Sequence, residues 1–175
     1  PLCHSTLRDL CGLAQAELVL YSTAFAVSTM DSDSPGSLVA DLPVLQLIMS
    51  GDNRDTWEED AQGLRARDIA MHVAMPEVDG RIITRAVSFK GLAYRCEHTE
   101  SDVVRYQPHA ERLAFVARLA EAWCVLRRKP NEDKRIALIL ANYPTREGRM
   151  GNGVGLDTPA SVVGILRRLL HEGYA

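Results

Sequence analysis

The sequence lacks the features that mark several large classes of protein. Its 175 residues carry a net charge of −3, so there is no excess of basic residues that would indicate nucleic-acid binding. No apolar run approaches the roughly 18 residues of a membrane span, and no secretion signal is visible. The four cysteines form no C-x-x-C pair and fit neither a zinc ribbon nor a disulfide scaffold. We therefore expect a cytoplasmic protein with reduced thiols and no membrane partner.

Both ends of the sequence suggest that it is a fragment. It starts at Pro1 rather than at a methionine, and it ends at Ala175 just after a predicted helix. Apolar residues make up 46%, which suffices for one core. We expect a single α/β domain over residues 1–175 that is a fragment of a much longer polypeptide.

Short apolar runs alternate with amphipathic segments along the chain. The runs predict strands, and the 3.6-residue periodicity predicts helices. Polar loops are expected at 30–37 and 50–53, Pro76 is expected to interrupt regular structure, and 91–107 to be irregular. The pattern predicts an α/β fold, a three-layer sandwich with a mostly parallel, flavodoxin-like sheet. The expected strands are 17–24, 44–49, 81–89 and 136–141, and the expected helices are 3–15, 65–72, 108–129 and 158–173, the last capped by Thr158.

A glycine-rich loop lies between the last predicted strand and the last helix. Repeated glycines let backbone N–H groups approach a ligand, and the following helix N-terminus favours an anion. Dinucleotide and S-adenosylmethionine folds have similar loops, but the G-x-G-x-x-G and Walker spacings are absent. A loop that needs glycines only for its turn is the alternative. The candidate binding residues are Arg149, Gly151, Asn152, Gly153 and Gly155.

A histidine and two carboxylates cluster around Pro76. His72, Glu77 and Asp79 lie within eight residues of one another. Imidazole and carboxylate can steer a divalent cation and accept a proton, and cobalt(II) accepts both as ligands. The alternative is that Asp79 belongs to a surface turn and His72 is a hydrogen-bonded packing residue.

Two motif blocks resemble one known family. The first is Ala74-Met-Pro-Glu-Val-Asp-Gly80 with Ala86-Val-Ser-Phe-Lys90, and the second runs from Asn142-Tyr-Pro144 through Gly148 to Ser161. Both resemble the large subunit of aerobic, ATP-dependent cobaltochelatase (CobN-type), which is related to the magnesium chelatase large subunit. The resemblance covers roughly residues 40–90 and 135–175.

The resemblance implies a function and roles for residues. It implies insertion of Co²⁺, as substrate, into hydrogenobyrinic acid a,c-diamide during cobalamin biosynthesis. It also implies that ATP is hydrolysed by AAA+ motor subunits and that the rest of the large subunit is a partner. Glu77 is then the candidate catalytic and metal-binding residue, and proximity adds His72 to both roles. Trp57 is a candidate to stack on the macrocycle, with packing as the alternative.

Three other functions remain open at this point. One is a magnesium chelatase acting on protoporphyrin IX, whose ion favours oxygen ligands. Another is a non-catalytic nucleotide- or S-adenosylmethionine-binding α/β module. The third is a structural domain whose glycine loop docks another part of the same chain.

Overall fold

The computed structural model describes residues 15–27, 42–140, 151, 153 and 155–174. The chain divides into two compact units, Pro1–Cys124 and Val125–Ala175, which are described separately. The single domain expected over residues 1–175 stays a prediction. The predicted helix 3–15, except for Gln15, and the predicted loop 30–37 lie outside the described residues.

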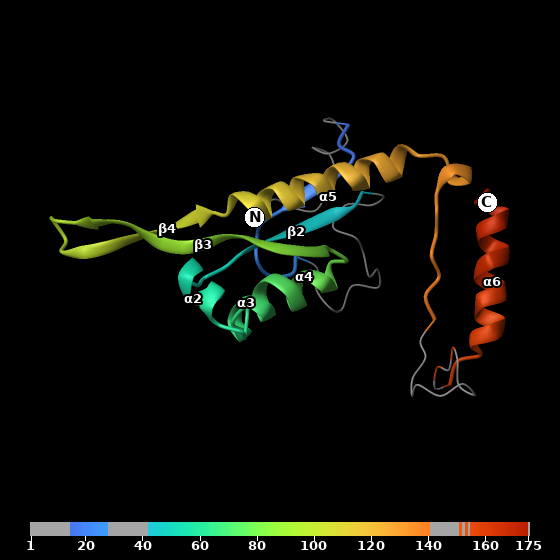
Figure 1. The fold of residues 1–175 in the computed structure, drawn as a ribbon, viewed down its shortest axis with the longest axis horizontal. Helices are drawn as coiled ribbons and strands as arrows, with labels where there is room; N and C mark the ends of the chain where they lie inside the picture. The colour runs from blue at the N-terminus through green and yellow to red at the C-terminus, as the bar shows by residue number, and fades with distance from the viewer. Residues whose placement is uncertain (1–14, 28–41, 141–150, 152, 154, 175) are drawn as a thin grey trace. The chain divides into compact units, whose positions relative to one another are not determined.

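The first unit is built on a mixed sheet (Figure 1). Its strands run in the order β1-β2-β3-β4, with parallel pairing of β1 to β2 and of β2 to β3 and antiparallel pairing of β3 to β4. The α/β class and the mostly parallel sheet are thus confirmed. The strands are β1 (Val19–Tyr21), β2 (Val44–Met49), β3 (Ile82–Cys96) and β4 (Ser101–Pro108).

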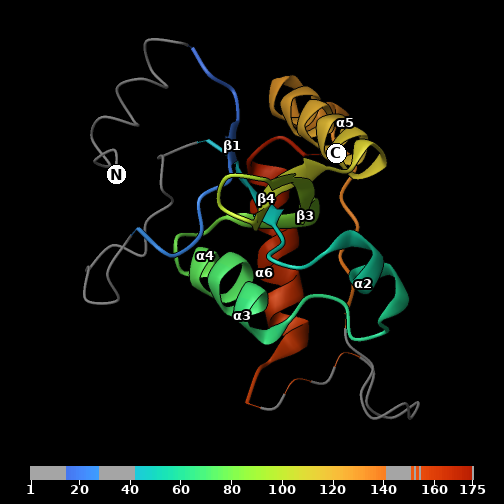
Figure 2. The same cartoon turned by 90° about the vertical axis from the view of Figure 1, so that its left-hand side faces the viewer.

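Helices lie on both sides of this sheet (Figure 2). On one side is α5 (Ala110–Arg128), which Arg112 joins to β3 by donating from Nε to the Ala86 carbonyl at 2.5 Å. On the other side, a core of Ile48, Ala86 and Phe89 is packed against Trp57 and Val73. The helices on that side are α2 (Arg54–Glu59), α3 (Ala66–Ile69), the π-helical turn η1 (Ala70–Ala74) and α4 (Met75–Val78).

Pro76 does not interrupt the helical structure, contrary to the prediction. Residues 66–78 are helical throughout, and Pro76 occupies the first turn of α4. The preceding turn is π-helical, with the Met75 N–H bonded to the Ala70 carbonyl. A proline lacks an N–H and is tolerated where a helix pattern starts anew, which explains its position here.

The prediction of irregular structure over residues 91–107 was also wrong. β3 continues to Cys96 and pairs with β4 along a long hairpin. The turn between them includes Glu100 at φ 50°. Tyr94, Val103 and Val104 favour strands despite the polar neighbours that suggested a loop.

The third buried strand expected over 136–141 is absent from the described residues 136–140. These residues form no strand, and Ile139 is 90% exposed. An apolar run becomes a buried strand only beside another strand, and within the described part of the second unit there is none for it to pair with. Ala141 lies outside the described residues.

The second unit contains η2 (Asn131–Asp133) and α6 (Thr158–His171). The helix is capped by Asp157, whose carboxylate accepts from the Ala160 N–H at 3.0 Å. The predicted cap, Thr158, is therefore wrong by one residue, while Pro159 does lie in the first turn. No described helix has both the length and the apolar character of a membrane span.

Candidate functional site

The candidate site lies where β2 ends, in the loop that begins at Ser50. Asp68 of α3, only 8% exposed, accepts from Ser50 Oγ at 2.9 Å and from the Gly51 N–H at 2.8 Å. Ser50 Oγ in turn accepts from the Asp52 N–H at 3.2 Å. One carboxylate thus fixes the strand-end loop to the helix that follows it. The carboxyl end of a parallel strand is a usual place for a ligand site in α/β proteins.

Asp52 holds the same loop from its other side. Its carboxylate lies 2.6 Å from Arg65 Nε, and its carbonyl accepts from the Lys90 N–H of β3 at 2.8 Å. Asp52 is buried, whereas the Arg65 side chain is 67% exposed. The loop is therefore braced by both α3 and β3, which keeps its geometry fixed.

His72 contributes a buried imidazole from the π-helical turn. It is 7% exposed, and Nδ1 has no hydrogen-bond partner among the described residues. Burial lowers the pKa of His72, and the nearby Asp68 carboxylate opposes part of that change. The imidazole is consequently neutral at pH 7. If His72 were only a packing residue, we would expect its ring nitrogens to be hydrogen-bonded. Nδ1 does not meet this expectation within the described residues.

These elements line a solvent-accessible cavity of about 150 Å³. Its lining is mostly polar and carries three cationic and two anionic side chains besides His72. Lys90 Nζ lies 5.6 Å from the centroid of the Tyr106 ring, which belongs to the strand paired with β3. The lining residues are Gly51, Asp52, Arg65, Arg67, Asp68, Met71, His72, Lys90 and Tyr106.

The structure does not bring His72 and Glu77 into one cavity. Glu77 is exposed on α4 and is not part of the cavity lining. Within the described residues, no three His, Cys, Asp or Glu side chains are grouped to hold a metal ion. The shared catalytic and metal-binding role of these two residues stays a prediction.

Asp79 is not in a surface turn, so that alternative is wrong. Its side chain is fully buried and forms an ion pair with Arg81, and it accepts from the Val27 N–H at 2.9 Å. Arg81 donates to Gln46 Oε1 at 2.8 Å and to the Thr23 carbonyl at 3.0 Å. This network joins the chain after β1 to the start of β3. A glutamine inside the apolar run of β2 was the available sequence signal, because a buried amide needs partners.

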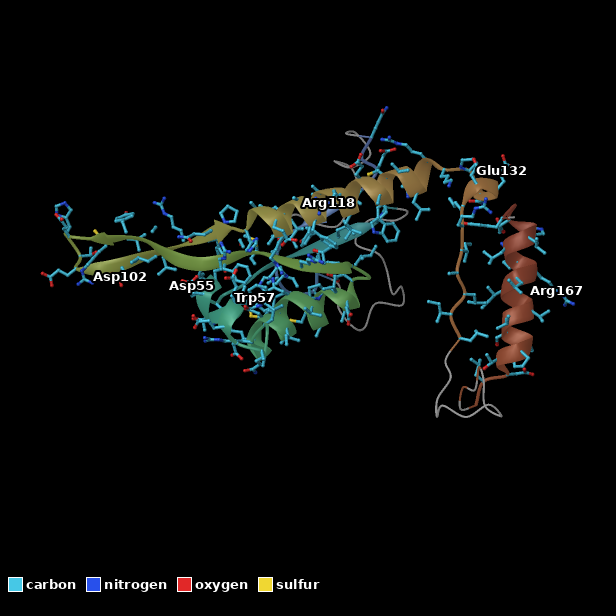
Figure 3. The ribbon with its side chains drawn as sticks, in the orientation of Figure 1. Asp55, Trp57, Asp102, Arg118, Glu132 and Arg167 are labelled. Atoms are coloured by element: carbon cyan, nitrogen blue, oxygen red, sulfur yellow. The ribbon has the colours of Figure 1, made fainter. Side chains whose placement is uncertain are left out.

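Trp57 packs inside the first unit. Its ring centroid lies 4.9 Å from that of Phe89, and the Arg112 guanidinium lies 4.6 Å from the Trp57 ring centroid. Figure 3 shows Trp57 on α2. These contacts favour the packing alternative over stacking on a macrocycle, for which a free ring face is needed. Binding of a ligand by Trp57 stays a prediction.

The described part of the glycine loop has the backbone expected of it. Gly151 and Gly155 have φ of 69° and 75°, values that favour glycine. Gly153 forms an isolated bridge with Leu156, so part of the loop closes on itself. Arg149 and Asn152 lie outside the described residues. The ligand-binding role of the loop stays a prediction.

Sequence reasoning missed Lys90 and Tyr106 as cavity residues. Lys90 was read only as part of a motif, and Tyr106 fell in the segment expected to be irregular. The register explains their position: Met49, the last residue of β2, pairs with Ser88, and Lys90 pairs with Tyr106. Both side chains are therefore level with the loop that follows β2.

The fold and this cavity define an α/β module with a polar site at a strand end, and comparison with known proteins places it in a family. The CobN/Magnesium Chelatase family model matches residues 2–175. The chain belongs to this family.

Relatives and a solved structure agree with that assignment. The chain is 54% identical over 172 residues to the aerobic cobaltochelatase subunit CobN of Pseudomonas aeruginosa, covering 98% of this chain and 14% of the relative. It is 46% identical to the protein of the same name from Sinorhizobium sp, covering 97% and 14%. The structure of the catalytic subunit of cobaltochelatase from Mycobacterium tuberculosis matches at a TM-score of 0.73 and 33% identity, over 97% of this chain and 14% of that one. The chain thus spans about one seventh of the length of these relatives.

Proposed function

We propose that this chain is part of the macrocycle-binding subunit of an ATP-dependent cobaltochelatase. In this proposal the complete subunit inserts Co²⁺ into hydrogenobyrinic acid a,c-diamide during cobalamin biosynthesis. The observation that carries the proposal is the 54% identity to a cobaltochelatase subunit along nearly the whole chain. The activity belongs to the complete subunit, since this chain covers only 14% of that relative.

Metal insertion requires a base, which His72 can supply. The macrocycle must lose two ring N–H protons as the cation enters, and a positioned base of suitable pKa speeds such transfers. His72 is neutral at pH 7 because burial lowers its pKa, and its Nδ1 has no partner in the described part of the chain. Because the cavity is too small to admit the ring, we propose that a ring proton reaches this neutral imidazole through a group or water in the cavity.

Glu77 suits a different task in the same reaction. Its carboxylate is exposed on α4, where it can meet a hydrated cation without a prior change of fold. Carboxylate oxygen is an acceptable ligand for cobalt(II). We propose that Glu77 delivers Co²⁺ or takes the second proton, and that it reaches the ring from outside the His72 cavity.

ATP hydrolysis is assigned to other polypeptides. The chain contains no Walker-type G-x-x-x-x-G-K-[ST] sequence that would cradle nucleotide phosphates. We propose AAA+ motor subunits as partners, along with the rest of the large subunit. The glycine loop at 151–155 then holds an anionic part of the ligand or docks a neighbouring part of that subunit.

The test is cobalt insertion by the full-length subunit with its motor partners. Glu77→Ala should reduce turnover by roughly 10²- to 10⁴-fold while macrocycle binding is largely kept, the range expected for loss of a group that moves protons. His72→Asn should also reduce turnover. Glu121→Gln on α5 is the control, because Glu121 is likewise an exposed carboxylate. Unchanged turnover in Glu77→Ala would instead indicate a structural domain.

Magnesium insertion into protoporphyrin IX is the second candidate, favoured by the family's inclusion of magnesium chelatases. Comparison of Co²⁺ with Mg²⁺ insertion by the same complex separates the two. Calorimetry with ATP and S-adenosylmethionine tests the non-catalytic module, which tight binding to the isolated chain would favour.

A further inference from the structure

The cavity beside His72 has two cationic side chains that form no hydrogen bond or ion pair within the described part of the chain. Among the described residues, Arg67 has no hydrogen bond or ion pair, and the Lys90 ammonium has only the Tyr106 ring, whose centroid lies 5.6 Å away. Both line the same cavity, one from α3 and the other from β3. Both residues are exposed, so an anionic ligand can reach the two cations from solvent.

The acidic residues of the cavity have partners of their own. Asp52 is paired with Arg65 at 2.6 Å. Asp68 accepts from Ser50 Oγ and the Gly51 N–H, so its carboxylate already has two donors. The lining therefore has one net positive charge, with Arg67 and Lys90 as the groups available to a ligand. This arrangement favours an anion over a metal ion.

His72 adds an uncharged polar side chain to the same lining. The residue is 7% exposed, and its Nδ1 has no partner among the described residues. Buried polar atoms in folded proteins are nearly always hydrogen-bonded. Nδ1 itself is covered by protein, so a ligand in the cavity would contact other atoms of the His72 side chain.

The size of the cavity limits the ligand. Its volume of about 150 Å³ is well below the roughly 300–1,000 Å³ of sites that enclose a whole drug-sized molecule. A tetrapyrrole cannot enter it, but a short acidic side chain of the ring can. Arginine and lysine both bind carboxylates through charge-assisted hydrogen bonds.

We propose that Arg67 and Lys90 bind a carboxylate side chain of the macrocycle in this cavity and so orient the ring. This inference rests on the proposed function and adds a substrate-binding site to it. The two residues are positioning residues that hold the periphery of the ring. Because they recognise charge, they distinguish a macrocycle with a free acid from its amide.

The experiment compares two ligands on the full-length subunit. The ligands are hydrogenobyrinic acid a,c-diamide and the same ring with its remaining carboxylates converted to amides. Arg67→Gln and Lys90→Gln should each weaken binding of the acid about tenfold, with less than about a twofold change for the amide. Arg118→Gln on α5 (Figure 3) is the matched control, since Arg118 is also exposed but is not among the residues that line the cavity.

Each outcome has a distinct meaning. If both variants bind the acid as wild type does, or lose acid and amide equally, the inference is overturned while the proposed function stands. If the wild-type subunit binds no macrocycle and its complex inserts no cobalt, the proposed function fails and the inference fails with it. ATP binding to the subunit alone that is weakened by Arg67→Gln would assign the cations to a phosphate and overturn the inference.

Discussion

Replacement of Arg81 by methionine should severely destabilise the first unit. The Arg81 and Asp79 side chains are both fully buried, and they form an ion pair. The guanidinium also donates to Gln46 Oε1 and to the Thr23 and Phe25 carbonyls at 2.8 to 3.0 Å. Methionine keeps much of the volume but removes every donor, so a buried carboxylate loses its cation.

The cost follows from the burial of both partners. Removal of one member of a buried ion pair costs roughly 3–5 kcal/mol, because the remaining charge is left in a medium that solvates it poorly. A typical domain has a free energy of unfolding of about 5–15 kcal/mol. The single substitution therefore removes a large share of the stability. Removal of both charges in Arg81→Met with Asp79→Leu should cost less than the sum of the two single changes, since no lone charge remains.

The assay is urea unfolding followed by tryptophan fluorescence, with hydrogen exchange at the Val27 amide as a local probe. Asp79 accepts from that amide at 2.9 Å, so its exchange should be faster in Arg81→Met as the carboxylate is rearranged. Arg118→Met is the control, because its side chain is exposed. A loss below about 1 kcal/mol, or strictly additive single changes, would refute this reasoning, because it would mean that the pair is solvated or uncoupled.

Two further predictions concern the helix cap and His72. Asp157→Ala should lower the free energy of unfolding by about 0.5–2 kcal/mol through loss of the cap on α6. Asp157→Ser should keep most of the stability, because serine can also cap a helix. Equal urea midpoints for the wild type and the two variants would contradict this prediction. His72 has a folded pKa below the ordinary 6.5, so the unfolded chain binds more protons between those values. Stability should be complete above about pH 6.5 and fall as the pH is lowered through the folded pKa. Urea midpoints measured from pH 7.5 to 4.5 should fall less in His72→Asn than in the wild type, because the variant lacks the titrating imidazole. If the two midpoints fall in parallel, His72 does not contribute to the acid sensitivity.

The parts of the fold that sequence predicted correctly depend on local patterns. The run Val44–Met49 has the bounds of β2, and the apolar stripe starting at Pro108 predicted α5, which spans Ala110–Arg128. Both are determined by the spacing of apolar residues over a short stretch. The run 136–141 has the same local pattern and failed in its described part, because a strand also needs a neighbour.

The candidate site was only partly accessible from sequence. Sequence predicted His72 as a candidate residue and a polar loop over residues 50–53, and the structure places His72, Gly51 and Asp52 at one cavity. Lys90 and Tyr106 reach that cavity only because β3 continues into a long hairpin with β4. Glu77, close to His72 in sequence, lies outside the lining.

The amino-acid sequence by itself determined the α/β class and the family. Apolar periodicity and sequence motifs depend only on the order of residues along the chain. The tertiary structure alone decided which polar side chains share an environment. Strand register set Lys90 level with the end of β2, and burial joined Asp79 to Arg81 and left His72 Nδ1 without a partner among the described residues. Spatial neighbours of this kind arise from strand pairing and desolvation, which act between residues far apart in the sequence.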